Sequence, residues 1–216
     1  MPQSLPASDR AHLLAWLSSV FLREPDAKVV GLLGADESDQ AVAELNNMPA
    51  LADETQAMLS ALRALRSREG SDANAALALA GRFGTLFLGA GGPMAAHPYA
   101  SIYEEGRTHG AATERTASFL STHGLSVGDG VPEPSDHLGI QLAALAALSE
   151  REVTEDDALS AELHRAQIVF VEAEMRPWLG TFRDRVIRDD PDGYYAAAAR
   201  LTEAALNEFY APPGTN

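Results

Sequence analysis

Three ionisable side chains, Glu133, Asp136 and His137, occur within the five-residue segment Glu133-Pro134-Ser135-Asp136-His137. Pro134 favours the first turn of a helix, because its missing N–H would have no intrahelical partner there. Acidic residues are favoured at the same end, since the N-terminus of a helix carries partial positive charge. The spacing therefore predicts a helix over 134–149 that carries all three side chains around its opening turn.

Two carboxylates and an imidazole suggest either acid–base catalysis or recognition of a cationic partner. Adjacent residues on a helix point in different directions, so Asp136 cannot easily orient His137 as a catalytic base. A small hydrolase or GTP-binding enzyme that uses the Asp136-His137 region stays open as an alternative. In the blander interpretation, Glu133 and Asp136 only start a helix and His137 only packs against the preceding loop.

The sequence motifs give little support for a metal site or a nucleotide-binding site. The six histidines form no His-Glu-x-x-His motif, and the absence of cysteine removes the common zinc spacings and any disulfide or thiolate nucleophile. The loop Gly89-Ala90-Gly91-Gly92 lacks the Gly-Lys-Ser/Thr of a phosphate-binding loop and follows no predicted strand. Glycines there also allow a tight turn and a close approach to a neighbouring helix.

The second informative segment is Pro98-Tyr99-Ala100-Ser101-Ile102-Tyr103. Tyr99, Ser101 and Tyr103 alternate with small or apolar residues, which neither a helix nor a plain turn explains. The segment lies in the main irregular stretch of the chain, about 88–107, and long loops in compact helical domains are often functional.

Elsewhere the apolar spacing is helical, with caps and breaks at the ends of each segment. No hairpin signal, sustained alternation or internal repeat occurs. We therefore expect an all-α fold of about ten helices, a single domain over 1–216 with lobes of about 1–124 and 133–216 joined by a loop at 124–134. The expected helices run from Ser8 to the Glu24-Pro25 stop, over 27–33, 38–46 and 53–68, from a Ser71 cap to near Gly89, over 111–123 and 134–149, from a Thr154 cap to a break at Arg176-Pro177, and over 178–188 and 194–210.

Four segments in order resemble one family of proteins. They are Phe83-Gly84-Thr85-Leu86-Phe87-Leu88-Gly89, Tyr99-x-Ser101-x-Tyr103, Glu133-Pro-x-Asp-His137 and Arg176-Pro177-Trp178-Leu179-Gly180-Thr181-Phe182. The chain resembles the TorD/DmsD/NarJ family of cytoplasmic maturation chaperones for molybdenum-cofactor oxidoreductases, which recognise the twin-arginine leader of their client. Tyr99 departs from the tryptophan that is frequent at this position in relatives.

The resemblance implies an all-α, non-catalytic chaperone with no cofactor of its own. It would bind the twin-arginine leader peptide and the apo molybdoenzyme catalytic subunit, aid cofactor insertion and proofread before export, as a monomer or a domain-swapped homodimer. Guanine nucleotide binding is linked to some relatives. A generic helical interaction module with an unrelated partner is the further alternative.

A receptor for such a leader needs an apolar groove rimmed by carboxylates, which can bind guanidinium groups in bidentate fashion. His137 would anchor the loop or donate to the peptide backbone. Core packing is the competing interpretation for every aromatic residue of the set. The expected peptide-binding residues are Leu86, Phe87, Tyr99, Ser101, Tyr103, Glu133, Asp136, His137 and Trp178.

The composition of the chain limits the classes of partner that we expect. The chain has 16 basic and 31 acidic residues and a formal net charge of -15, which argues against nucleic acid, because phosphates require Lys and Arg. The N-terminal segment Met1-Pro2-Gln3-Ser4-Leu5-Pro6 lacks the features of a secretory signal, and no run reaches the ~18 apolar residues of a membrane span. We expect a cytoplasmic protein without membrane insertion.

Overall fold

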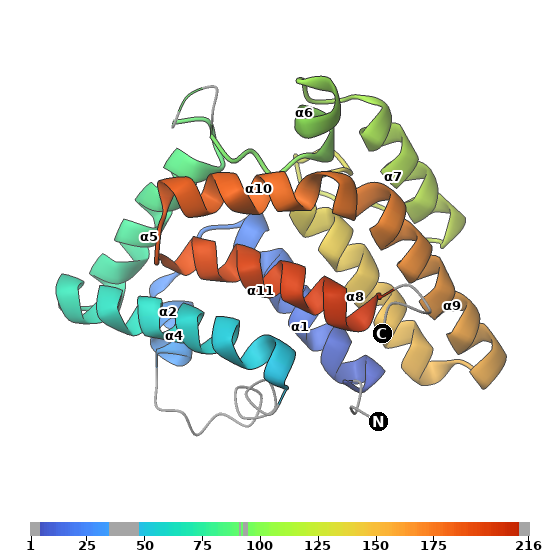
Figure 1. Cartoon of the computed structure of the whole chain (residues 1–216), viewed down its shortest axis with the longest axis horizontal. Coiled ribbons are helices and arrows are strands. Elements are labelled where there is room, and N and C mark those ends of the chain that lie inside the picture. Colours follow the sequence, from blue (N-terminus) through green and yellow to red (C-terminus); the bar gives the residue numbers. More distant parts are fainter. Residues whose placement is uncertain (1–4, 35–47, 91, 93–94, 212–216) are drawn as a thin grey trace. The chain divides into compact units, whose positions relative to one another are not determined.

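The computed structural model describes residues 5–34, 48–90, 92 and 95–211, and helices dominate this part of the chain (Figure 1). No strand occurs among these residues, and Tyr99 and His137 form an isolated antiparallel bridge. The all-α prediction is confirmed. The helices are α1 (Ala7–Leu22), α2 (Ala27–Leu33), α4 (Pro49–Glu69), α5 (Asp72–Leu86), α6 (Ala100–Glu105), α7 (Ala111–Thr122), α8 (Leu138–Thr154), α9 (Asp157–Phe170), the π-helix η1 (Val171–Met175), α10 (Arg176–Asp189) and α11 (Tyr194–Phe209).

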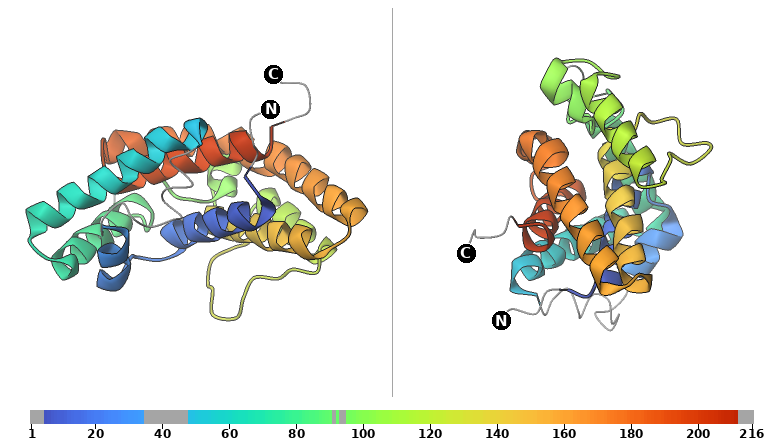
Figure 2. Two further views of the ribbon diagram at one scale, coloured as in Figure 1. Left: turned by 90° about the horizontal axis from the view of Figure 1, so that it is seen from below. Right: turned by 90° about the vertical axis from the view of Figure 1, so that its right-hand side faces the viewer.

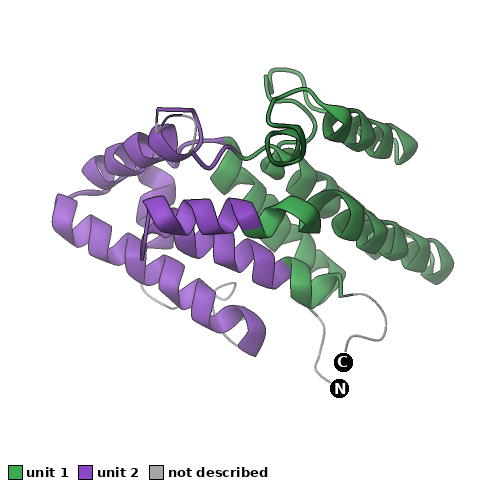
Figure 3. Ribbon diagram, turned by 45° about the horizontal axis from the view of Figure 1, so that its top comes forward, with its two compact units in different colours: residues 1–22, 98–180, 206–216 green, residues 23–97, 181–205 purple. Residues whose placement is uncertain are grey.

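The chain divides into two compact units, each assembled from segments that are distant in sequence (Figure 3). Unit 1 contains residues 1–22, 98–180 and 206–216, and unit 2 contains residues 23–97 and 181–205. The sequence predicted lobes of about 1–124 and 133–216 instead. The difference arises because packing partners are not neighbours along the chain: α1 packs along α8 in unit 1.

In unit 1, α1 and α8 lie side by side (Figures 1 and 2), and their backbones approach closely at Gly139. The Ser18 hydroxyl donates to the Gly139 carbonyl at 2.6 Å. A Cβ atom at position 139 would lie 2.9 Å from the backbone oxygen of Ser18 and would also meet the Leu22 side chain. Glycine is therefore required here by the contact between the two helices rather than by backbone conformation.

Replacing Gly139 by alanine should lower the free energy of unfolding by about 1–3 kcal/mol, because the added methyl group forces two packed helices apart. Chemical denaturation of the purified protein would measure this change. Gly84→Ala in α5 is the matched control, since no atom lies within 4 Å of the added Cβ and alanine is the better helix former by up to ~1 kcal/mol. Equal effects of the two substitutions would contradict the close approach.

Unit 2 contains an aromatic cluster in its core. The Phe87 ring lies 5.1 Å from Phe83, 5.3 Å from Tyr195 and 6.1 Å from Phe182, measured between ring centroids. Leu86 and Phe87 are each only 1% exposed. The end of α5 is therefore held in place by aromatic packing in the unit core.

Several helix boundaries differ from those expected. The helix expected at 134–149 begins at Leu138, because Glu133-Pro134-Ser135-Asp136 forms the turn before it. The break expected at Arg176-Pro177 is instead a π turn, in which the Arg176 N–H donates to the Val171 carbonyl five residues earlier. The wider turn leads into α10 with Pro177 in its first turn, where a missing N–H is tolerated. The helix expected over 38–46 lies outside the described residues.

Candidate functional site

The structure brings the two sequence motifs of unit 1 together. The Ala100 N–H donates to the Asp136 carbonyl at 3.2 Å, and the Leu138 N–H donates to the Pro98 carbonyl at 2.8 Å. Tyr99 has extended backbone angles and forms the antiparallel bridge with His137. The extended pairing ends at Tyr99, and Ser101 and Tyr103 lie in α6, so the alternation after Pro98 belongs largely to a helix that the sequence did not predict.

Asp136 is fully buried beneath this pairing. One carboxylate oxygen accepts the Ser101 N–H at 2.9 Å and the other accepts the Thr113 hydroxyl at 2.7 Å. Ser101 belongs to the first turn of α6 and Thr113 to the first turn of α7. The carboxylate therefore accepts a backbone N–H that has no partner within α6, and it also binds a side chain at the start of α7. Its two oxygens are both occupied and buried, which makes Asp136 a positioning residue in this structure rather than an acceptor for an incoming guanidinium.

His137 caps the N-terminus of α8. Its Nδ1 atom accepts the Gly139 N–H at 3.0 Å, which leaves the proton of the neutral ring on Nε2. Burial lowers the pKa of His137 to about 4, although the nearby carboxylates of Glu133 and Asp136 act in the opposite direction. A neutral imidazole at this position is therefore part of the helix cap.

The free energy of unfolding should consequently depend on the protonation of His137. The pKa of His137 is 6.5 in the unfolded chain and about 4 in the folded protein. Between these two pH values, the imidazole is protonated in the unfolded chain and neutral in the folded protein. Stability from this residue is therefore complete above pH ~6.5 and falls by roughly 3 kcal/mol as the pH drops to ~4. Denaturation curves recorded across this range measure the loss.

His137→Asn is the matched variant for that measurement, because the amide oxygen can still accept the Gly139 N–H but does not titrate. We expect the variant to lose less stability than the original protein over the same pH range. Parallel pH profiles of the two proteins would contradict the assignment.

Tyr99 and Glu133 form the partly exposed edge of the site. The Tyr99 hydroxyl donates to the Glu133 carboxylate, and the Tyr99 ring meets the His137 ring edge-on at 5.0 Å. Burial, followed by the hydrogen bond to Glu133, raises the pKa of Tyr99 well above its usual range. Tyr99 is thus a neutral donor that fixes one oxygen of Glu133, and the second carboxylate oxygen can accept another donor.

Several of the other expected residues lie in the interior. Trp178 is 1% exposed, stacks on the half-buried Tyr103 at 5.4 Å and donates its Nε1–H to the Glu174 carbonyl. Ser101 is fully buried. Leu86 and Phe87 lie in the core of unit 2 rather than in unit 1. Of the nine expected residues, Tyr99, Tyr103 and Glu133 present partly exposed side chains.

Unit 1 also contains an apolar groove that the sequence interpretation missed. It has a volume of about 430 Å³ and lies between α7, α9 and η1. Phe119 and Phe170 stack at 4.0 Å beneath it, and Val169 is 67% exposed. Its lining residues are Arg115, Phe119, His123, Glu162, Arg165, Ala166, Val169, Phe170, Ala173 and Glu174. We refer to this set as the unit 1 groove.

The unit 1 groove has a charged end formed by an arginine clamp. Arg115 on α7 contacts both carboxylate oxygens of Glu174 at 2.8 and 2.9 Å and both of Glu104 at 2.8 and 3.1 Å. Glu174 lies in η1 and Glu104 in α6, so one guanidinium joins three elements beside the groove. Each carboxylate is contacted by a single guanidinium nitrogen, Glu174 by Nε and Glu104 by Nη2 of Arg115.

A sequence signal for the groove does exist. Ala166, Val169, Phe170 and Ala173 follow one another at helical spacing and form an apolar stripe. That stripe is continuous across the change from α9 to the π-helix, and π turns are frequent at functional sites. Within this stripe Phe170 is buried and Val169 is 67% exposed, a difference that the spacing does not show.

The described part of the chain has neither a metal-binding cluster nor a membrane-spanning helix. Among residues 5–34, 48–90, 92 and 95–211, no group of three or more His, Asp or Glu side chains is arranged to hold a metal ion. Within these ranges, every helix is too short or too polar to span a bilayer. In the glycine loop after α5, the Gly92 N–H donates to the Gly89 carbonyl, which is a turn; Gly91 lies outside the described residues.

Comparison with known proteins gives consistent matches along most of the chain. Residues 48–184 match the family model described as nitrate reductase delta subunit. The chain is 34% identical over 202 residues to the chaperone protein TorD of Vibrio cholerae serotype O1, covering 92% of this chain and 89% of that protein. It is 32% identical to TorD of Vibrio vulnificus, over 90% of each chain. A solved chain from Archaeoglobus fulgidus, described as a candidate redox enzyme maturation protein, matches with a TM-score of 0.46 and 22% identity over 90% of this chain and 92% of that one.

Proposed function

The chain belongs to the nitrate reductase delta subunit family, among chaperones of the TorD type that act in molybdoenzyme maturation, and on this premise we propose that it binds the twin-arginine leader of an apo molybdoenzyme in the unit 1 groove. It is a chaperone rather than an enzyme. The leader would be held in the cytoplasm until the cofactor is inserted, and released for export afterwards.

The exposed apolar surface of the unit 1 groove carries this proposal. A twin-arginine leader presents an arginine pair followed by an apolar stretch, and a helical apolar stretch can lie in a groove of this kind. The groove is formed by exposed Val169 over the stacked rings of Phe119 and Phe170. Its volume of about 430 Å³ is sufficient for two or three apolar side chains, not for a whole leader.

Carboxylates near the groove supply the complementary charge. Ser135 and Asp136 bind Thr113 at the start of α7, which places the turn carrying Glu133 at the same helix that forms the groove. Glu162 belongs to the groove itself, whereas both oxygens of Glu174 are already bound by Arg115. With a net charge of -15, the protein also attracts a basic peptide at long range, an effect that salt weakens.

Titration calorimetry with a synthetic leader peptide of the client tests the proposal. We expect binding that weakens at least tenfold when both arginines of the peptide are replaced by alanine, because each loses a charge-assisted contact worth ~1.5–3 kcal/mol. The loss should be smaller at high salt. Equal affinity for the two peptides would overturn arginine recognition, and absence of binding by both would overturn the proposed function.

A further inference from the structure

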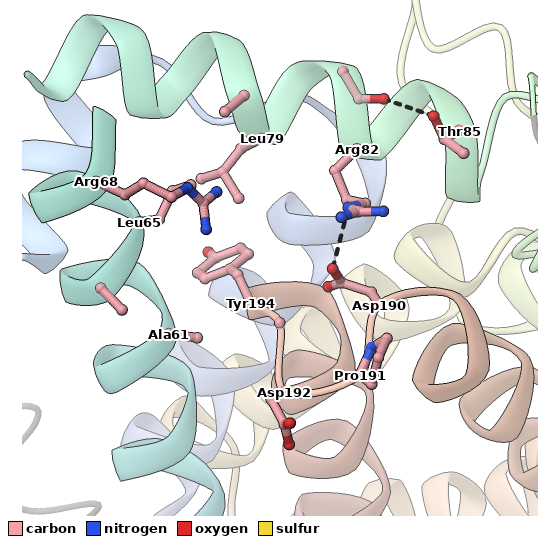
Figure 4. Close-up of a pocket in the computed structure, with 14 residues that line it drawn as sticks. Ala61, Leu65, Arg68, Leu79, Arg82, Thr85, Asp190, Pro191, Asp192 and Tyr194 are labelled. Atoms are coloured by element: carbon pink, nitrogen blue, oxygen red, sulfur yellow. Dashed lines mark hydrogen bonds and ion pairs between the residues drawn. The ribbon is translucent and has the colours of Figure 1, made fainter. Parts of the chain in front are cut away.

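Unit 2 contains a pocket that the proposed function does not use (Figure 4). It has a volume of about 460 Å³ and lies between α4, α5 and the turn that precedes α11. Small apolar side chains of α4 and α5, including Ala61, Ala64, Leu65 and Leu79, form part of its wall. Pockets of this size accommodate small organic molecules, and an apolar wall suits a ligand with an apolar body.

Tyr194 lines this pocket with a buried aromatic side chain. Its side chain is 5% exposed, and Figure 4 shows the ring turned into the pocket on the side of Arg68. None of the described residues forms a hydrogen bond with its hydroxyl, and burial alone raises the pKa of Tyr194. A hydroxyl that opens into the pocket and has no partner in the described chain can donate to an acceptor on a ligand.

Two arginines add further donors to the pocket. Arg82 contacts the Asp190 carboxylate at 3.2 Å and donates to the Asp189 carbonyl at 3.3 Å. Arg68 contacts Glu69 through Nε at 3.0 Å, and its side chain is 70% exposed. Because a guanidinium carries five N–H donors, these contacts leave both arginines with donors for another acceptor.

The acceptors that line the pocket are largely occupied. Asp190 receives Arg82 and also accepts the Tyr195 N–H at 3.2 Å. The Thr85 hydroxyl donates to the Gly81 carbonyl at 3.0 Å. Asp192 points away from the arginines and Tyr194 in Figure 4. The pocket thus has an excess of hydrogen-bond donors beside an apolar wall.

We propose that this pocket binds a small organic oxyanion, a carboxylate or a phosphate ester carried on an apolar body, through Arg68, Arg82 and the Tyr194 hydroxyl. Two oxygens of such a group match a guanidinium in bidentate geometry, and the Tyr194 hydroxyl can donate to the same group. The binding site lies wholly in unit 2 and is independent of leader recognition in unit 1.

Titration of the full chain with benzoate and with phenyl phosphate, followed by NMR or calorimetry, tests this site. At least one of the two anions should bind more tightly than neutral benzyl alcohol, and the tighter of them identifies the preferred oxyanion. Tyr194→Phe removes a hydroxyl that has no partner in the described chain, and Arg68→Gln changes a largely exposed side chain. Each should weaken binding about tenfold.

Arg107→Gln is the matched control for Arg68→Gln. Arg107 is 66% exposed and pairs with a nearby glutamate, as Arg68 does, but it lies in unit 1. We expect it to leave the affinity for the anion unchanged. The site is overturned if neither anion binds, if benzyl alcohol binds as tightly as the anions, or if the Tyr194 and Arg68 variants bind like the Arg107 variant.

Discussion

Replacing Asp136 by alanine should lower the free energy of unfolding by about 3 kcal/mol or more. The fully buried carboxylate accepts the Ser101 N–H and the Thr113 hydroxyl, and alanine would leave both donors buried without a partner. Hydrogen bonds to a charged group contribute ~1.5–3 kcal/mol each, and a buried donor without a partner costs ~1–3 kcal/mol. Denaturation with urea measures the change, and exchange of the α6 amides should increase at the same time.

Two variants separate this structural role from a general effect of charge. Asp136→Asn keeps one carbonyl acceptor and should lose about half as much stability. Glu133→Ala removes a half-buried acid that is bonded to Tyr99 and should cost less than ~1.5 kcal/mol. If Asp136→Ala destabilises the protein no more than Glu133→Ala does, Asp136 is not the residue that fixes α6 and α7.

Replacing Val169 by glutamine should weaken binding of the leader peptide about tenfold while stability changes little. Val169 is 67% exposed over the aromatic stack of the unit 1 groove, so the free protein loses little packing. Covering such a side chain with an apolar peptide contributes ~1.5 kcal/mol, which corresponds to about tenfold in affinity. Calorimetry with the leader peptide and a denaturation curve for the variant measure the two quantities separately.

Val153 offers the matched control for this substitution. It is 57% exposed and lies on α8 of the same unit, but it is not part of the groove. Val153→Gln makes the same chemical change on the surface and should leave the affinity unaltered. Equal losses for both variants would contradict the groove as the binding surface and would point to a non-specific loss of surface hydrophobicity.

Local chemistry was sufficient to predict much of the fold. Ser71 caps α5 as expected, with its hydroxyl accepting the Asn74 N–H at 3.1 Å. The helix over 27–33 has the expected bounds, with Asp26 as its cap. The turn at 189–193 separates α10 and α11 because proline and glycine interrupt both helical patterns. These features depend on residues within a few positions of each other, which is why the sequence reveals them.

The rest of the fold depends on contacts between residues that are distant in sequence. A carboxylate at position 136 could cap its own helix or bind elsewhere, and its partners Ser101 and Thr113 are separated from it by 35 and 23 residues. Because Asp136 binds these two residues instead of forming part of its own helix, α8 begins at Leu138. Membership of the two units is likewise decided by the packing of α1 along α8, which no local pattern specifies.

For the candidate site, the structure joins the two motifs at the Tyr99–His137 bridge, whereas the exposure of the expected residues does not follow from their spacing. Leu86, Phe87 and Trp178 have the same residue types in a core as in a groove, and all three are about 1% exposed. Conversely, Val169 continues a core-like stripe but is open to solvent. Periodicity identifies an apolar face without showing whether another helix covers it.

Mapping of the leader peptide on the protein by amide NMR tests the central claim most directly. We predict that the largest shifts on peptide addition occur in α7, α9 and η1, around Phe119, Val169 and Phe170, with a smaller group around Tyr99 and Glu133. The residues of the unit 2 pocket, such as Arg82 and Tyr194, should change little. Shifts concentrated in unit 2, with the unit 1 groove unaffected by a peptide that binds, would contradict the account.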